Sequence, residues 1–131
     1  MIAQYPTSEQ LHALLAGPPD VPVVMVNLLR LKAHADAPDA GLTGEAAYRR
    51  YVEQMKPFIE SKGARILWTG RLDAQVIGSD ADGFQMMALV EYPSRQAFVA
   101  IATDPFVAEI GVHRAAGLEG QWLLAATTEQ P

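Results

Sequence analysis

Apolar residues fall into four runs that are typical of β-strands. The first, Val21 to Leu31, is almost continuously apolar, which indicates a central strand with both faces covered. Alternation along this run places Asn27 on the same face as Val23 and Met25, so we expect its amide to project into a buried layer. The other three runs are Ala64 to Ile77, Phe84 to Tyr92 and Leu118 to Ala126.

Helical spacing of apolar residues predicts four helices. A short one should follow Thr7, with Gln10 completing a capping box, and the longest should start after Thr43 and end at Gly63. Pro57 lies inside the longest helix and predicts a kink or a break there. The last two helices are marked by their first residues, the cap Ser94 and the pair Asp104-Pro105.

The order of these elements predicts an α+β protein with the ferredoxin-like βαββαβ arrangement. It consists of a four-stranded antiparallel sheet with helices on one side, an extra N-terminal helix, and a single domain over residues 1–131. Helices would cover only one face of this sheet, although the Val21 to Leu31 run is apolar on both faces. We therefore expect a homodimer in which two copies pack sheet against sheet.

Two segments carry more specific expectations. Residues 32–42 have no apolar periodicity and should form a loop long enough to act as a lid. In the strand Ala64 to Ile77, strict alternation would put Ile66 and Trp68 on one face and Arg71 on the other, unless Gly70 marks a bulge.

Composition excludes several functional classes. The chain has 131 residues, no cysteine and a formal net charge of -5, which argues against disulfides, thiolate chemistry, nucleic acid and anionic membranes. No signal sequence or membrane-spanning run is evident, so we expect a cytoplasmic protein. Neither a Gly-rich phosphate loop nor convincing metal-ligand spacing occurs, so we expect no cofactor, although a single histidine could still ligate haem.

Several short motifs carry a family resemblance. They are MVNLL at Met25–Leu29, GEAAYRRY at Gly44–Tyr51, VEYPSRQAF at Val90–Phe98, DPF at Asp104–Phe106 and HRAAGL at His113–Leu118. Together they resemble a bacterial family of unknown function within the dimeric α/β-barrel superfamily. That resemblance implies a ferredoxin-like fold, a homodimer that closes a barrel from two sheets, and a pocket in each half of the barrel. It implies no activity, because the superfamily includes cofactor-independent oxygenases, haem-degrading oxygenases, haem peroxidases, a lactone isomerase and effector domains.

His113, Arg114 and Asn27 are the candidate catalytic residues. Histidine is the usual acid or base near neutral pH, and His113 lies close to a helix end beside Arg114. Both cations could instead complement the helix dipole or anchor the following turn. Asn27 could bind a ligand or satisfy backbone groups within the sheet.

Met25, Tyr48, Trp68 and Glu91 are the candidate ligand-binding residues. Met25 and Trp68 would suit a flat apolar pocket, but they would equally suit a dimer interface or core. Tyr48 lies on the apolar stripe of the longest helix and could be a core aromatic. Glu91 could act as a base or form an ion pair with Arg30, Arg71 or Arg114.

These residues leave three functional hypotheses open. The first is a cofactor-independent oxygenase or isomerase that acts on a small apolar or aromatic molecule. The second is a non-catalytic module that binds such a molecule, and the third is a structural homodimer whose own side chains fill the barrel.

Overall fold

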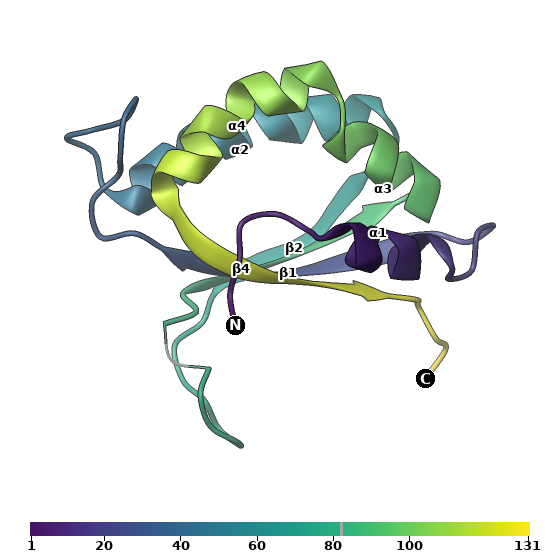
Figure 1. Cartoon of the computed structure of the whole chain (residues 1–131). Helices are drawn as coiled ribbons and strands as arrows, with labels where there is room; N and C mark the ends of the chain where they lie inside the picture. The colour runs from purple at the N-terminus through teal and green to yellow at the C-terminus, as the bar shows by residue number, and fades with distance from the viewer. Residues whose placement is uncertain (82) are drawn as a thin grey trace.

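The computed structural model describes residues 1–81 and 83–131 and shows an α+β fold (Figure 1). The four strands form one antiparallel sheet in the order β2-β3-β1-β4, the ferredoxin-like arrangement expected from the sequence. Its elements are α1 (Ser8–Leu15), β1 (Val23–Leu31), α2 (Gly44–Ser61), β2 (Arg65–Arg71), β3 (Met86–Tyr92), α3 (Arg95–Ala102), α4 (Pro105–Gly117) and β4 (Leu118–Ala126).

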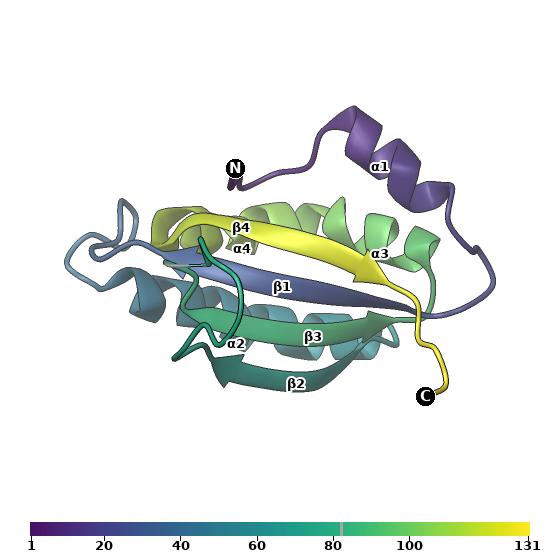
Figure 2. The same cartoon turned by 90° about the horizontal axis from the view of Figure 1, so that it is seen from below.

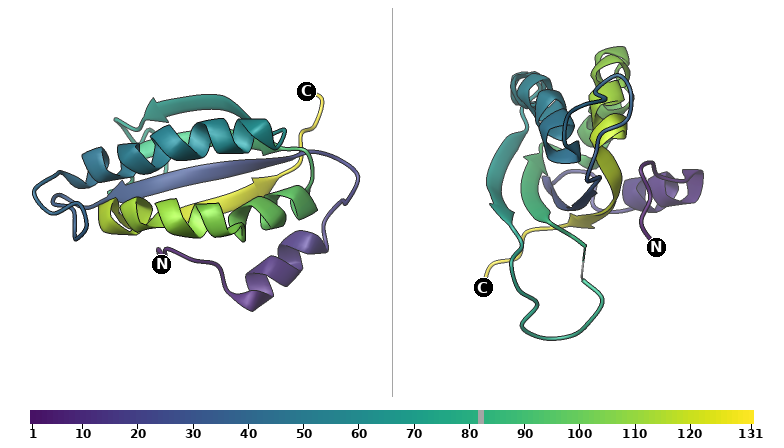
Figure 3. Two further views of the ribbon diagram at one scale, coloured as in Figure 1. Left: turned by 90° about the horizontal axis from the view of Figure 1, so that it is seen from above. Right: turned by 90° about the vertical axis from the view of Figure 1, so that its left-hand side faces the viewer.

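The molecule has two layers. Helices α2, α3 and α4 lie on one face of the sheet, while α1 lies beside β4 at the edge of the sheet (Figures 1 and 2). In the part of the chain that the structure describes, no helix covers the opposite face. The segment 72–81, between β2 and β3, projects from that uncovered side (Figure 3). Within the described residues no helix is long and apolar enough to cross a membrane.

The predicted helix starts are confirmed at all four positions. Thr7 accepts a hydrogen bond from the Gln10 backbone and Gln10 reaches back to the Thr7 backbone, which completes the capping box. The caps of the other helices are Thr43, Ser94 and Asp104, and each accepts a backbone N–H of the following turn.

The longest helix continues through Pro57 without a break. Pro57 lies in the last two turns of α2, and the sequence pattern left open whether the helix would end there. The helix ends at Ser61, and Gly63, the predicted terminator, follows the C-cap Lys62 with a φ of 91°, a conformation that glycine adopts without strain. The Gly63 and Ala64 amides donate to the carbonyls of Glu60 and Ile59, which satisfies the end of the helix.

The second strand differs from the sequence-based expectation in length and in face. It ends at Arg71 rather than Ile77, because Arg71 pairs with Met86 at the start of β3 and residues 73–81 have no partner strand in the described chain. An irregularity in register falls between Ile66 and Trp68, not at Gly70. Because one extra residue reverses the alternation, Ile66 faces the helices and Trp68 faces the uncovered side.

Two glycines hold α2 and α4 in direct backbone contact. A Cβ on Gly44 would lie 2.7 Å from the Gly117 carbonyl oxygen and would clash with the Lys32 carbonyl. A Cβ on Gly117 would lie 2.9 Å from the Tyr48 amide nitrogen. The start of α2, the end of α4 and the end of β1 therefore meet at a point where only glycine fits.

We expect Gly117→Ala to lower the free energy of unfolding by about 1–3 kcal/mol, because the added methyl group has no space. Gly111→Ala is the matched control in the same helix, since no atom of the described residues lies within 4 Å of the position that its added methyl group would take. It should raise the free energy of unfolding by about 0.5–1 kcal/mol. Urea unfolding measures the free energy of unfolding of both variants. Equal changes at the two positions would contradict the claim that only glycine fits at Gly117.

Candidate functional site

A cavity of about 360 Å³ lies between α2 and the helix-facing side of the sheet. Most of its lining is apolar, and the side chains come from α2 and from strands β1, β2 and β3. Size and lining are both typical of a site for a small organic molecule, at the lower end of the ~300–1,000 Å³ range. The apolar and aromatic lining residues on α2 and on the helix-facing side of the sheet are Leu29, Tyr48, Tyr51, Val52, Met55, Ile59, Ile66, Met86, Ala88, Val90 and Tyr92.

Three tyrosines bring hydroxyl groups to this cavity. Tyr48 and Tyr51 come from α2, with ring centroids 5.4 Å apart, and Tyr92 comes from the end of β3. None of the three hydroxyls has a hydrogen-bond partner among residues 1–81 and 83–131. None is fully enclosed either, so each remains accessible from open space. A polar group of this kind needs water or a ligand as its partner.

Asn27 adds an acceptor at the centre of the sheet. Its Nδ2 donates to the carbonyl oxygens of Met25 and Ala88, at 3.3 and 3.4 Å. Because both partners are acceptors, they fix the amide orientation and leave Oδ1 as the free group. Oδ1 has no hydrogen-bond partner in the described part of the chain, and Asn27 lines the cavity. Asn27 lies on the predicted face, together with Val23, Met25 and Leu29.

The tyrosines are neutral hydrogen-bonding groups at physiological pH. Burial raises the pKa of Tyr48 and of Tyr92 far above the usual value, and the neighbouring Tyr51 raises the pKa of both further. Burial also raises the pKa of Tyr51, while the Arg114 guanidinium lowers the pKa of Tyr51 to a smaller extent. These phenols therefore suit hydrogen bonding to a ligand and do not suit proton abstraction.

Charged side chains lie at the mouth of the cavity, along α2. Glu45 Oε1 is 2.5 Å from Arg71 Nη2, which connects the start of α2 to the end of β2. Arg49 is farther from Glu45, with an N–O distance of 3.6 Å, and Lys56 lies two turns along the same helix. Glu45 is the carboxylate that lines the cavity among the described residues, and it is ion-paired.

His113 contacts a buried carboxylate outside this cavity. Its Nδ1 lies 2.7 Å from Oδ2 of Asp39, whose other oxygen is 2.8 Å from Arg50 Nη1. The Asp39 side chain has no exposed surface. Burial alone would raise the pKa of Asp39, but the contacts with His113 and Arg50 lower it further than burial raises it. Asp39 is therefore an ionised acceptor, and His113 Nδ1–H donates to it.

This contact fastens the loop 32–42 to the helices. Asp39 lies in the loop, while Arg50 belongs to α2 and His113 to α4. The Asp36 amide also donates to the Ala116 carbonyl. No residue of this loop lines the cavity, so in this structure the loop does not act as a lid over it.

Arg114 acts on the cavity from outside it. Its guanidinium donates to the Gln4 carbonyl at 2.5 Å and to the Gln121 side chain at 3.2 Å, and it lies over the Tyr5 ring. Arg114 does not line the cavity, yet its charge is close enough to lower the pKa of Tyr48 and Tyr51. Its direct contacts hold the N-terminal segment against α4 and β4.

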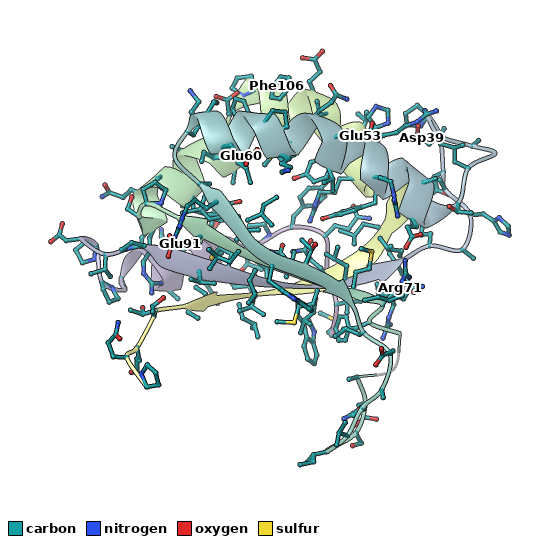
Figure 4. All side chains as sticks on the ribbon, turned by 180° about the vertical axis from the view of Figure 1, so that it is seen from behind. Asp39, Glu53, Glu60, Arg71, Glu91 and Phe106 are labelled. Atoms are coloured by element: carbon teal, nitrogen blue, oxygen red, sulfur yellow. The ribbon has the colours of Figure 1, made fainter. Side chains whose placement is uncertain are left out.

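Three other candidates lie apart from the cavity. Met25 belongs to the closed core between sheet and helices. Trp68 is half-exposed on the uncovered face of the sheet. Glu91 points to that same face and pairs with Arg65 at 2.8 Å, so it does form an ion pair, although with a partner the sequence did not suggest. Figure 4 shows Glu91 at the opposite end of the strands from Arg71.

The structure thus brings Asn27 and Tyr48 together and adds Tyr51 and Tyr92, which the sequence analysis did not assign to the ligand site. Tyr51 shared the helical stripe with Tyr48, so the spacing alone could have paired them. Tyr92 ends a strand far away in sequence and gave no local signal.

A second hollow, of about 250 Å³, lies on the uncovered face beside Phe84 and Trp122. Among the described residues, no three His, Asp or Glu side chains gather as a metal site.

We expect Asp39→Asn to lower the free energy of unfolding at pH 7 by about 1–3 kcal/mol, because it removes a buried charged acceptor. The folded-state pKa of Asp39 lies below its ordinary value of 3.8, so the stabilisation is complete above that value and is lost as pH falls through the folded pKa. Urea unfolding from pH 7 to 3 should show the two proteins converging in acid. Asp36→Asn, in the exposed pair with Lys32, should change little, and a pH-independent difference for Asp39→Asn would contradict the assignment.

Comparison with known proteins agrees with this fold. The crystal structure of RPA0582, a protein of unknown function from Rhodopseudomonas palustris, matches with a TM-score of 0.89 and 31% sequence identity over 100% of both chains. The structure of methylated RPA0582 matches with a TM-score of 0.88 and 32% identity, over 98% of this chain and 96% of that one. No curated protein matches the sequence. A family model described as a domain of unknown function, DUF1330, matches residues 39–128, and the chain belongs to that family.

Proposed function

We propose that the protein binds a small, largely apolar molecule in the cavity between α2 and the sheet. The molecule would carry one or more oxygen functions, because the neutral polar groups that line the cavity are hydroxyls and an amide. Asn27 Oδ1 accepts a hydrogen bond from a ligand hydroxyl or N–H, and the tyrosines can donate to a carbonyl or hydroxyl oxygen.

One observation carries this proposal. Four polar groups without partners among the described residues, those of Asn27, Tyr48, Tyr51 and Tyr92, line a single apolar cavity. Because these groups open onto the cavity, water or a ligand inside it can supply their hydrogen-bond partners. Phenylalanine at the three tyrosine positions would fill the same space without presenting a hydrogen-bonding group to the cavity, so the hydroxyls support a binding role.

Binding is better supported than proton-transfer catalysis. Among the described lining residues the sole carboxylate is the ion-paired Glu45, and none is a histidine. The neutral phenols and the nearby Arg114 charge do favour a second candidate, an isomerase or oxygenase that needs no cofactor. In that role the phenols would stabilise negative charge that develops on a ligand oxygen. Incubation with a bound ligand separates the two: an unchanged ligand supports binding, and a product supports catalysis.

Tyr→Phe variants test the cavity directly. Each of Tyr48→Phe, Tyr51→Phe and Tyr92→Phe should weaken binding of an oxygen-bearing ligand by about three- to tenfold, the value of one neutral hydrogen bond. Tyr5→Phe is the matched control, because Tyr5 is exposed and lies away from the cavity. Calorimetric titration against a panel of phenols and cyclic ketones measures these affinities. Equal affinities for all four variants would place the ligand elsewhere.

We also propose that two copies of the chain associate through their uncovered sheet faces. Each face carries apolar side chains from all four strands, and Val76 and Ile77 of the projecting segment are 88% and 90% exposed on the same side. An apolar face of this extent is typical of an interface. A sheet of identical shape and twist is complementary to it, which supports a second copy as the partner. The apolar residues that register and alternation place on this face are Val24, Val26, Leu28, Trp68, Met87, Leu89, Trp122 and Leu124.

Leu124→Asp should convert the homodimer to monomer, because it would bury a carboxylate within an apolar interface. Leu124 is 53% exposed in the single chain, so the substitution should cost the folded monomer little. Val112→Asp is the control: Val112 is 47% exposed, on α4 in the helical layer. Sedimentation velocity measures both variants, and a dimeric Leu124→Asp protein would reject the sheet-face interface.

A further inference from the structure

The mouth of the α2 cavity carries more positive than negative charge. Arg49 and Lys56 line it together with one carboxylate, Glu45, and that carboxylate also pairs with a third cation, Arg71. The mouth is therefore locally cationic, although the whole chain has a formal net charge of -5. The other two acidic residues of α2, Glu53 and Glu60, are labelled in Figure 4 and do not line the cavity. Among the described residues neither has an N–O distance of 4.0 Å or less to Arg49 or Lys56.

Lys56 differs from most cations of this chain. Lys32, Arg50, Arg65 and Arg71 each have a carboxylate within 4.0 Å. In the described part of the chain, the Lys56 ammonium has no ion pair, no hydrogen bond and no cation–π contact. Two other cations of α2 and its C-cap have only weak partners. Arg49 lies 3.6 Å from Glu45, and the Lys62 ammonium lies over the Phe58 ring.

Helix geometry brings the two mouth cations to the same opening. Arg49 and Lys56 are seven residues apart, which is close to two helical turns, so they project from one face of α2 about 10 Å apart along its axis. Tyr51, Val52 and Met55 line the cavity between them. Because both side chains are long and flexible, one anionic group at the mouth can contact both of them.

We propose that the ligand of this cavity is a small organic acid. Its apolar part lies among the tyrosines and strand residues between α2 and the sheet, and its carboxylate lies at the mouth with Arg49 and Lys56. This inference rests on the proposed binding function and adds the chemical class of the ligand. An amphipathic acid matches the site at both ends, because the interior is apolar with neutral hydrogen-bonding groups and the rim is cationic.

Pairs of carboxylates and their primary amides test the charge requirement. Benzoate, 4-hydroxybenzoate and 2-naphthoate have nearly the same shape as their amides and differ in charge. We expect wild-type protein to bind the tightest acid of the panel about tenfold more tightly than its amide at low salt, and this preference should shrink as salt increases. Calorimetric titration of the full-length chain measures each dissociation constant.

The double variant Arg49→Gln/Lys56→Gln should remove the preference for the acid and leave the affinity for the amide unchanged. Lys62→Gln is the control with a charge change at the end of the same helix, outside the cavity lining, and it should retain the preference. Equal binding of acid and amide by the wild type, or a preference that survives in the double variant, would overturn the organic-acid inference while leaving the proposed binding function in place. Failure of every acid and amide to bind would count against both.

Discussion

The close backbone contact between Gly44 and Gly117 sets the position of everything else in the site. At this point the start of α2, the end of α4 and the end of β1 approach so closely that no side chain fits. The Lys32 amide donates to the Gly117 carbonyl there, at 2.8 Å, so the contact is also hydrogen-bonded. Since Tyr48 is one turn into α2, the same contact fixes where the tyrosine-bearing face of that helix lies over the sheet.

A second anchor lies on the other side of the helices. Asp39 joins the loop before α2 to Arg50 of that helix and to His113 of α4. Together with the glycine contact at Gly44, it holds the first half of α2 at its start and at Arg50. The helix therefore keeps its position although side chains do not fill the space beneath it. The two most conspicuous candidate residues in the sequence, His113 and Arg114, thus contact the supporting structure, whereas an amide and three phenols line the cavity.

Local patterns in the sequence were sufficient for the fold and for part of the site. Capping residues and apolar periodicity predicted every helix start, and alternation along β1 placed Asn27 on the helix-facing side. The prediction that Trp68 shares a face with Ile66 was wrong, because an irregularity in register between these two residues reverses the alternation from Trp68 onward. No residue type at this position indicates the irregularity in advance. Asp39 was not recognised because it lies in a loop without periodicity, and its partners are 11 and 74 residues away. The cavity itself depends on the spacing between a helix and a sheet, which no local pattern encodes.

If the space between α2 and the sheet is a ligand site, the protein purified from its native host should carry a molecule there. We expect a crystal structure of that protein to show electron density for an organic molecule in contact with Asn27 Oδ1 and with at least one of the hydroxyls of Tyr48, Tyr51 and Tyr92. A cavity closed by repacked side chains, with those hydroxyls bonded to protein groups, would contradict it.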